Sequence, residues 1–310
     1  MITINTKYSN IKLLIHREEH GRRICRADLV GSNIQLGRCH FLHQDDPFLR
    51  LGPHKMEVLQ KDPFRMIFHD FLSEDEIDFL ITYSVPRLST QREKQAFNRR
   101  QKKHDYGSKQ VRVVSKTVQC WIDDVRFNKT SSDSVTALSS NDYDVVHQIL
   151  LKLSRKIEAA TRLKVIGRFS STQYQTTNYG LGGLCETHID PHGYIEGMEL
   201  TPDRQGLINT GDMIATFMAW LNDVEAGGYT AFDHVNYEQR LEPTRGSAAF
   251  WLDLNKKGFR ELRSSHMGCT VLKGSKWILN KWIYYYDQFQ NYPCGLQSNE
   301  PMEAFAKFYV

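Results

Sequence analysis

Residues 186–192 read ETHIDPH and place two histidines and two acids within seven positions. His188 and Asp190 are separated by one residue, so on an extended strand both side chains point to the same side. A strand could therefore present an imidazole and a carboxylate to one metal ion. A second histidine from elsewhere would complete the facial triad of two histidines and one carboxylate that binds divalent iron. The spacing alone is a weak signal, because His43 and Asp45 repeat it.

Three histidines are candidates for the missing ligand. His192 lies too close along the chain to coordinate easily beside the first pair, and His234 follows a turn and is expected at the surface. His266 lies 78 residues after His188, at the start of a strand-like run, and Lys276 follows it by ten residues. A lysine is rarely buried without a partner. If Lys276 points into a barrel, we expect its ammonium to meet an anion.

Two helices are predicted in the first half of the chain. Ser73 and Glu76 form a capping-box pattern at the start of the first helix, and Pro86 ends it. The second helix starts near Asn141, which can cap it. Its apolar residues recur at helical spacing and predict one buried face. These are Val146, Ile149, Leu150, Leu153 and Ile157.

From about residue 168 the apolar period changes to two. The β-rich runs are FSSTQYQTTNYG, MIATFMAWLNDV, GSAAFWLDL, CTVLKG and KWILNKWIYYY, with turn residues between them. Many short strands at this spacing predict a barrel or a double-sheet jelly roll. A strand is also predicted over QVRVVSKTVQCWI, whereas residues 1–62 look polar and irregular.

Composition is typical of a globular protein, with 40% hydrophobic and 25% charged residues. No apolar run is long enough to span a bilayer, so no membrane span is expected. The net charge is +4, but residues 92–116 alone hold nine basic and two acidic residues, so the rest of the chain is slightly acidic. Such a run is usually a solvated loop. No nucleic-acid-binding motif accompanies it, so no nucleic-acid partner is expected.

Several longer runs resemble a known family. They are NYGLGGLCETHID, IATFMAWLNDVEAGGYTAF, GSAAFWLDL and SHMGCTVLKGSKWILNKW. Together with DPFRMIFHDFLSEDEIDFL upstream, they closely resemble the catalytic domain of collagen-type prolyl 4-hydroxylase alpha subunits, over roughly residues 60–294. Those proteins are Fe(II)- and 2-oxoglutarate-dependent dioxygenases. The order H-x-D, then a distant histidine, then a lysine ten residues later is the most specific part of the resemblance.

The resemblance implies an α+β, mainly β fold with a double-stranded β-helix (jelly-roll) core and supporting N-terminal helices. It divides the chain into an N-terminal extension (1–62), a dioxygenase domain (63–294) and a C-terminal tail (295–310). It also implies site residues: His188, Asp190 and His266 as iron ligands, and Lys276, Tyr179, Thr216 and Trp282 around 2-oxoglutarate. Strand packing alone would also explain Tyr179, Thr216 and Trp282.

The implied reaction is hydroxylation of peptidyl proline at C4, with O2 and 2-oxoglutarate consumed, succinate and CO2 formed, and ascorbate keeping the iron reduced. The implied partners are a proline-containing peptide or collagen-like chain and protein disulfide isomerase. Four residues depart from the family pattern: Met213, Thr187, Cys185 and Asp233. They leave two alternatives open, a hydroxylase of a non-collagen peptide and a catalytically weak or inactive peptide-binding module.

The six cysteines show no C-x-x-C spacing, which argues against structural zinc. By resemblance, Cys25 is expected to pair with Cys39, and Cys269 with Cys294. Disulfides imply an oxidising compartment, here the endoplasmic reticulum lumen or the secretory pathway. The Asn128–Lys129–Thr130 sequon is consistent with this compartment. No signal peptide is visible at the N-terminus.

Overall fold

The protein is represented by a computed structural model. The structure describes residues 19–26, 39–42, 47–90, 114–122, 140–193, 210–293 and 295. The basic segment up to residue 113, the sequon, the His43–Asp45 repeat and the tail beyond 295 lie outside the described residues. Within the described part of the chain, no helix combines the length and apolar character needed to cross a membrane.

Most of the regular elements are strands, and only a few are helices. The strands are β1 (Cys39–Leu42), β2 (His54–Lys61), β3 (Phe64–His69), β4 (Val114–Ile122), β5 (Tyr174–His188), β6 (Met213–Trp220), β7 (Ala226–Gly227), β8 (Thr230–Phe232), β9 (Gln239–Leu241), β10 (Ala248–Leu252), β11 (His266–Gly268), β12 (Val271–Lys273) and β13 (Lys276–Tyr284). The helices are a segment at residues 19–25, α2 (Pro47–Leu51), α3 (Glu74–Ser84) and α5 (Ser140–Thr161), with 3₁₀ turns at Val85–Arg87 and Leu262–Ser264.

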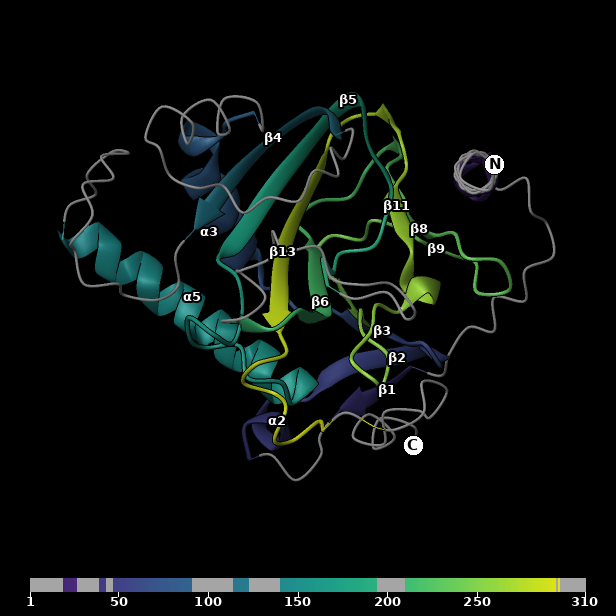
Figure 1. The fold of residues 1–310 in the computed structure, drawn as a ribbon. Coiled ribbons are helices and arrows are strands. Elements are labelled where there is room, and N and C mark those ends of the chain that lie inside the picture. Colours follow the sequence, from purple (N-terminus) through teal and green to yellow (C-terminus); the bar gives the residue numbers. More distant parts are fainter. Residues whose placement is uncertain are drawn as a thin grey trace, which may run out of the picture.

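Eleven strands form one antiparallel sheet that curls on itself (Figure 1). Its order is β1-β2-β3-β10-β6-β13-β5-β11-β8-β9, with β4 added on β5, and β12 and β7 form a separate pair. The long strands β4, β5, β13 and β6 make one wall, and β11, β8 and β9 face it (Figure 1). This arrangement confirms the predicted α+β, mainly β fold with a jelly-roll core.

Alternation along the strands separates the interior of the curled sheet from its helix-covered side. On β6, Met218 and Trp220 belong to the cluster inside the curl. The residues between them, such as Phe217 and Ala219, belong to the larger cluster that also contains α3 and α5 side chains. Every second residue of β13 likewise points inward, beginning with Lys276. The inward face is the one that can build a site.

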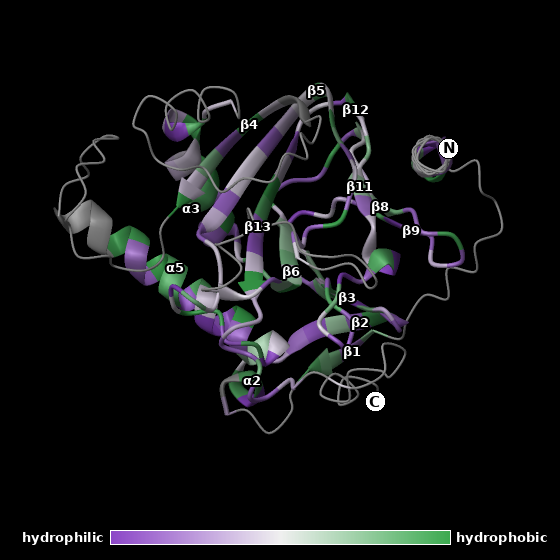
Figure 2. Cartoon of the chain, viewed as in Figure 1, coloured by the Kyte–Doolittle hydropathy of each residue, from purple (hydrophilic) through white to green (hydrophobic). Residues whose placement is uncertain are grey.

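The two predicted helices are confirmed. Ser73 caps α3, with its side chain accepting from the Glu76 N–H while Glu76 bonds back to the Ser73 N–H. The second helix, α5, begins at Ser140, so Asn141 lies inside it and not at its cap. Hydrophobic and hydrophilic residues alternate along α5 (Figure 2). Leu150 and Leu153 on its apolar face are buried against the sheet.

The prediction that residues 1–62 are irregular is wrong for four segments of the described chain, the helix at residues 19–25, β1, α2 and β2. β1 pairs with β2, and β2 pairs with β3, so both extend the main sheet. Leu42, Leu49 and Met56 are buried in the main core. β2 reads HKMEVLQK, in which charged residues interrupt the apolar alternation. Of its eight residues only Met56 is buried, so the strand needs few apolar residues and its signal in the sequence is faint.

The expected cysteine pairing is also wrong. Cys25 forms its disulfide with Cys269, not with Cys39. Cys39 is an exposed free thiol, and Cys294 lies outside the described residues. The helix at residues 19–25 explains the difference, because it buries Ile24 against the strands next to Cys269. Sequence spacing gives no indication of a contact between residues 244 positions apart.

Candidate active site

Strand pairing brings the two distant histidines together. His266, the first residue of β11, is the direct antiparallel partner of His188, the last residue of β5. Directly opposed residues on antiparallel strands have neighbouring side chains on the same face of the sheet. Asp190 follows His188 by two residues and its side chain returns to the same side. Register alone therefore brings residues 78 positions apart in the sequence to one point.

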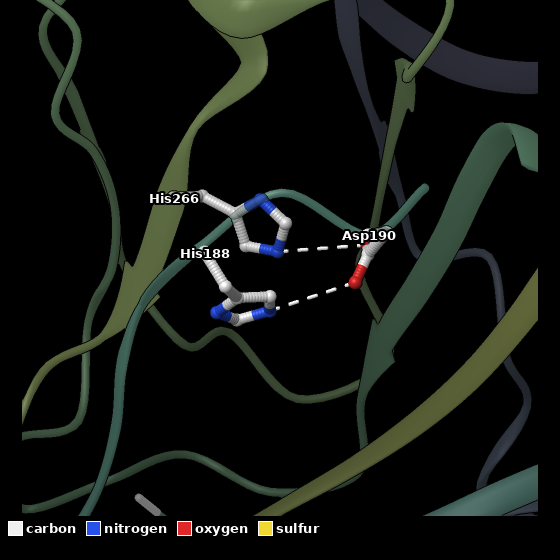
Figure 3. Close-up of side chains that lie close together, drawn as sticks. All are labelled: His188, Asp190 and His266. Atoms are coloured by element: carbon white, nitrogen blue, oxygen red, sulfur yellow. Dashed lines mark ion pairs between the residues drawn. The ribbon is translucent and has the colours of Figure 1, made fainter. Parts of the chain in front are cut away.

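The three side chains converge (Figure 3). Asp190 Oδ1 lies 3.5 Å from His188 Nε2, and Asp190 Oδ2 lies 3.6 Å from His266 Nε2. The ring centroids are 4.3 Å apart, and one ligand atom from each residue lies within 4.8 Å of the others. In the described part of the chain this is the one such group of histidine, cysteine and acidic side chains. His192 and His234 are not part of it.

Backbone carbonyls select the tautomer of both imidazoles. His188 Nδ1 lies 2.7 Å from the Glu186 carbonyl oxygen, and His266 Nδ1 lies 3.0 Å from the Ser264 carbonyl oxygen. A carbonyl only accepts, so each Nδ1 carries the proton and each Nε2 presents a lone pair. Both lone pairs face Asp190. The donor set therefore fits a divalent metal that prefers two imidazoles and one carboxylate.

Lys276 enters the same pocket from the first position of β13. Its side chain is 2% exposed, and its Nζ donates to Thr230 Oγ1 at 3.1 Å. Burial lowers the pKa of Lys276 to about 7, partly offset by the nearby Cys185. The pocket has a volume of about 140 Å³ and is also lined by the three convergent residues. A buried ammonium in a small pocket is a site for an anionic group.

Tyr179 and Trp282 line this pocket too. Tyr179 is the direct cross-strand partner of Lys276, and its ring centroid lies 5.7 Å from the Lys276 Nζ. Trp282 stacks at a tilt on Trp121, with centroids 5.9 Å apart. Its buried indole Nε1 has no hydrogen-bond partner among the described residues. Tyr179, on β5, therefore lies beside the start of β13, and Trp282 lies near the other end of that strand.

Thr216 also lines the pocket, and its hydroxyl contacts two acids, of which the sequence suggested only Asp190. Thr216 Oγ1 lies 2.7 Å from Asp190 Oδ2 and 2.7 Å from Asp253 Oδ2. Burial, with the charge of Asp190 as a second cause, raises the pKa of Asp253 well above its usual range. Sequence reasoning missed Asp253, although an acid at the end of the buried strand AAFWL was a signal that could have been used.

Two of the four departures from the family pattern contact each other. The Thr187 hydroxyl donates to Asp233 Oδ2 at 2.6 Å. Cys185 lines the pocket, with its Sγ 3.7 Å from His188 Nδ1. Met213 begins β6 opposite Tyr284 and is not among the pocket-lining residues. The departures thus change the surroundings of the histidines and leave the convergent residues in place.

The chain is similar to known proteins over most of its length. Residues 174–284 match the 2OG-Fe(II) oxygenase superfamily. Prolyl 4-hydroxylase subunit alpha-2 of Caenorhabditis elegans is 32% identical over 268 residues, which cover 86% of this chain and 42% of that protein. Prolyl 4-hydroxylase subunit alpha-3 of Bos taurus is 31% identical over 257 residues, covering 83% and 40%. The chain thus spans well under half the length of these relatives.

Among solved structures, the viral collagen prolyl hydroxylase vCPH from Paramecium Bursaria Chlorella virus-1 matches 71% of this chain and 95% of its own. The identity is 18% and the TM-score 0.44. The sequence match at 174–284 contains His188, Asp190, His266 and Lys276. Residues 174–284 therefore match a 2OG-Fe(II) oxygenase domain, and most of the chain is similar to part of the prolyl 4-hydroxylase alpha subunits.

Proposed function

We propose that this chain is an Fe(II)- and 2-oxoglutarate-dependent dioxygenase that hydroxylates peptidyl proline at C4 and forms succinate and CO2. The observation that carries the proposal is the convergence of two imidazole lone pairs, one carboxylate and one buried ammonium in a single pocket. His188, Asp190 and His266 would hold Fe(II), and Lys276 would bind the distal carboxylate of 2-oxoglutarate. When bound, the iron supplies the activation of O2.

The protein's own contribution is orientation and exclusion of water. Lys276 attracts an anion at one end of the pocket, where few water molecules screen its charge. Tyr179 lies beside it as a further hydrogen-bond donor for the cosubstrate, and Thr216 fixes the carboxylate of Asp190. Met218, Ile278 and Trp251 contribute apolar surface between these groups, which limits the water that can surround them.

The proposal also concerns which proline-containing peptide is the substrate. Cys185 lines the pocket and the Thr187 hydroxyl donates to Asp233, and all three residues depart from the family pattern. These changes alter the surface next to His188, which a peptide must approach. They favour a proline-containing peptide other than a collagen-like chain as the alternative substrate. A catalytically inactive peptide-binding module is the second alternative.

The compartment and partners belong to the same proposal. The Cys25–Cys269 disulfide supports an oxidising compartment, which for this family is the endoplasmic reticulum lumen. Ascorbate is the expected reductant of the iron. Protein disulfide isomerase is the expected partner subunit, and co-purification of the two chains from co-expressing cells tests that expectation.

The experiment is an assay of the purified chain with Fe(II), ascorbate, 2-oxoglutarate and a panel of proline-containing peptides. We expect succinate to form, and a peptide to gain the mass of one oxygen atom at proline. His266→Ala should abolish both, because one of the three ligands is lost. His234→Ala is the matched control and should retain activity, because His234 lies outside the convergent group.

Turnover of 2-oxoglutarate without any hydroxylated peptide would support an oxygenase with another substrate. Absence of succinate under every condition, with iron bound, would favour the inactive binding module.

A further inference from the structure

Asp253 forms the end of a short chain of buried polar groups behind the iron site. Its Oδ2 lies 2.7 Å from Thr216 Oγ1, which lies 2.7 Å from Asp190 Oδ2. All three side chains are at most 2% exposed. The position of Asp253 is set by the backbone, because its N–H donates to the Ile214 carbonyl at 2.8 Å. The contact with Thr216 therefore follows from the pairing of β10 with β6.

If both acids are ionised, these three side chains hold one proton fewer than two hydrogen bonds require. A threonine hydroxyl has a single proton to donate, and an ionised carboxylate only accepts. Two carboxylates at 2.7 Å from the same hydroxyl oxygen would then share one proton, and one of the two close contacts would bring oxygen lone pairs together. A second proton on one of the acids turns both contacts into hydrogen bonds.

The surroundings of the two acids show which of them carries that proton. Asp190 faces the Nε2 lone pairs of two imidazoles at 3.5 and 3.6 Å, so a metal cation held by these three side chains would lie beside its negative charge. The charged groups that act on Asp253 are Asp190 and Asp212, and both are acids. Asp253 Oδ1 is buried, and the hydrogen-bond donors that act on this carboxyl group in the described part of the chain, the Thr216 hydroxyl and the Trp251 indole, are both neutral. An ionised carboxylate in such a position is far more costly than a neutral one.

We propose that Asp253 is a positioning residue for the iron ligand Asp190, and that it acts as a neutral carboxylic acid that donates its proton to Thr216. The inference rests on the proposed function only in taking the three convergent residues as a metal site. Asp253 Oδ2–H donates to Thr216 Oγ1, and the Thr216 hydroxyl then directs its own proton to Asp190 Oδ2. The carboxylate of Asp190 is thereby held in one orientation relative to both imidazoles.

The test compares two replacements of Asp253. Asp253→Asn keeps the shape and supplies a permanently neutral N–H donor to Thr216. Asp253→Leu removes the donor and keeps an apolar side chain of comparable size. The readout is the affinity of the metal-free protein for Co²⁺, which replaces Fe(II) because it resists oxidation. We expect the Asn variant to bind like the wild type, and the Leu variant to bind about 10–100-fold more weakly, as when other partners of metal ligands are lost.

A second readout does not involve the metal. The infrared spectrum of the metal-free wild type at neutral pH should show the carbonyl band of a protonated carboxylic acid, and that band should be missing in Asp253→Asn. Thermal unfolding checks that each variant folds. If the Leu variant does not fold, Thr216→Val takes its place, because it removes the middle hydroxyl of the same chain with little change of shape.

Three results would overturn the proposal. They are an Asn variant that binds Co²⁺ as weakly as the variants without a donor, a folded Leu variant that binds like the wild type, and a wild type without the acid band. The proposed function fails separately. If no peptide is hydroxylated but Co²⁺ affinity follows the order above, the role of Asp253 stands and only the enzyme activity is refuted.

Discussion

The charge state of Lys276 is governed by its burial in the pocket. Its ammonium has the Thr230 hydroxyl and the Tyr229 carbonyl as neutral partners, at 3.1 and 3.5 Å. Burial without an acidic partner is what lowers the pKa of Lys276 to about 7. An anionic cosubstrate would stabilise the charged form, so its binding should be accompanied by uptake of a proton above pH 7.

The first prediction concerns the pH dependence of 2-oxoglutarate affinity. Above about pH 7 the free protein increasingly holds Lys276 neutral, whereas the complex needs it protonated. The affinity should therefore fall by up to about tenfold for each pH unit above 7. Lys276→Arg keeps its charge at every pH in this range, so its affinity should stay level. Calorimetric titration of the Co²⁺-loaded proteins between pH 7 and 9 measures both slopes.

Only the slopes are compared, because arginine fills the pocket differently and can weaken binding at every pH. Parallel slopes for the two proteins would show that a group other than Lys276 controls the pH dependence.

At the scale of single residues, the sequence predicted the positions of side chains whose spacing along a strand determines the face on which they lie. The alternation of side chains on a strand predicted that His188 and Asp190 share a side, and the resemblance added His266 and Lys276. The structure brings all four to one pocket. Asp253 could not be found in this way, because its contact with Thr216 depends on which residues of β6 and β10 are paired.

At the scale of elements, the helix at residues 19–25 lies against residues next to both candidate histidine ligands. A Cβ added to Gly21 would lie 2.6 Å from Met267 Sδ and 3.4 Å from Thr187 Oγ1. Met267 follows His266, and Thr187 precedes His188. A side chain at position 21 would therefore have to displace the Met267 side chain or the helix itself.

The second prediction is that Gly21→Leu disturbs the metal site from outside. The larger side chain must displace the helix or Met267, at a typical overpacking cost of about 1–3 kcal/mol. We expect a lower melting temperature and weaker Co²⁺ binding. Arg23→Leu is the control on the exposed face of the same helix and should change neither quantity. A Gly21→Leu protein with unchanged Co²⁺ affinity would show that the helix does not influence the site.

The third prediction concerns the disulfide that fastens this helix. Peptide mapping without reduction should recover Cys25 linked to Cys269. Cys25→Ser should lower the free energy of unfolding in urea by about 2–4 kcal/mol, the usual contribution of a native disulfide. Cys39→Ser should leave it unchanged, because Cys39 is an exposed free thiol. A peptide linking Cys25 to Cys39 would restore the pairing implied by the resemblance and contradict the structure.

Elements with strong local signals were predictable, and elements defined by their neighbours were not. The capping box of Ser73 and Glu76 is a local hydrogen-bond pattern, and it predicted the start of α3 correctly. The strand β2 owes its existence to pairing with β3, which no local pattern reports. The disulfide depends in the same way on a long-range contact.

At the scale of the whole molecule, the sheet is continuous from β1 to β9, and the candidate site lies on its inner face. The resemblance predicted this jelly roll, and the change of apolar period near residue 168 located its larger half. The boundary predicted at residue 63 is a separate matter and stays a prediction. β1 and β2 precede that boundary, yet they extend the sheet beyond β3.

The fourth prediction compares two deletions, one of residues 1–38 and one of residues 1–62. Both remove Cys25, so the loss of the disulfide is common to them. Only the longer deletion removes Leu42, Leu49 and Met56, which are at most 3% exposed. Burial of such side chains contributes about 1.5–3 kcal/mol each. Together they amount to a large part of the roughly 5–15 kcal/mol that stabilises a typical domain.

We therefore expect the protein lacking residues 1–38 to unfold cooperatively, at a lower melting temperature than the full chain. The protein lacking residues 1–62 should be insoluble or unfold without a cooperative transition, because β3 becomes an uncovered edge with exposed apolar neighbours. Circular dichroism melts and the soluble yield distinguish the two outcomes. Equal melting temperatures for the two truncated proteins would show that β1 and β2 are dispensable, and that the domain does begin at residue 63.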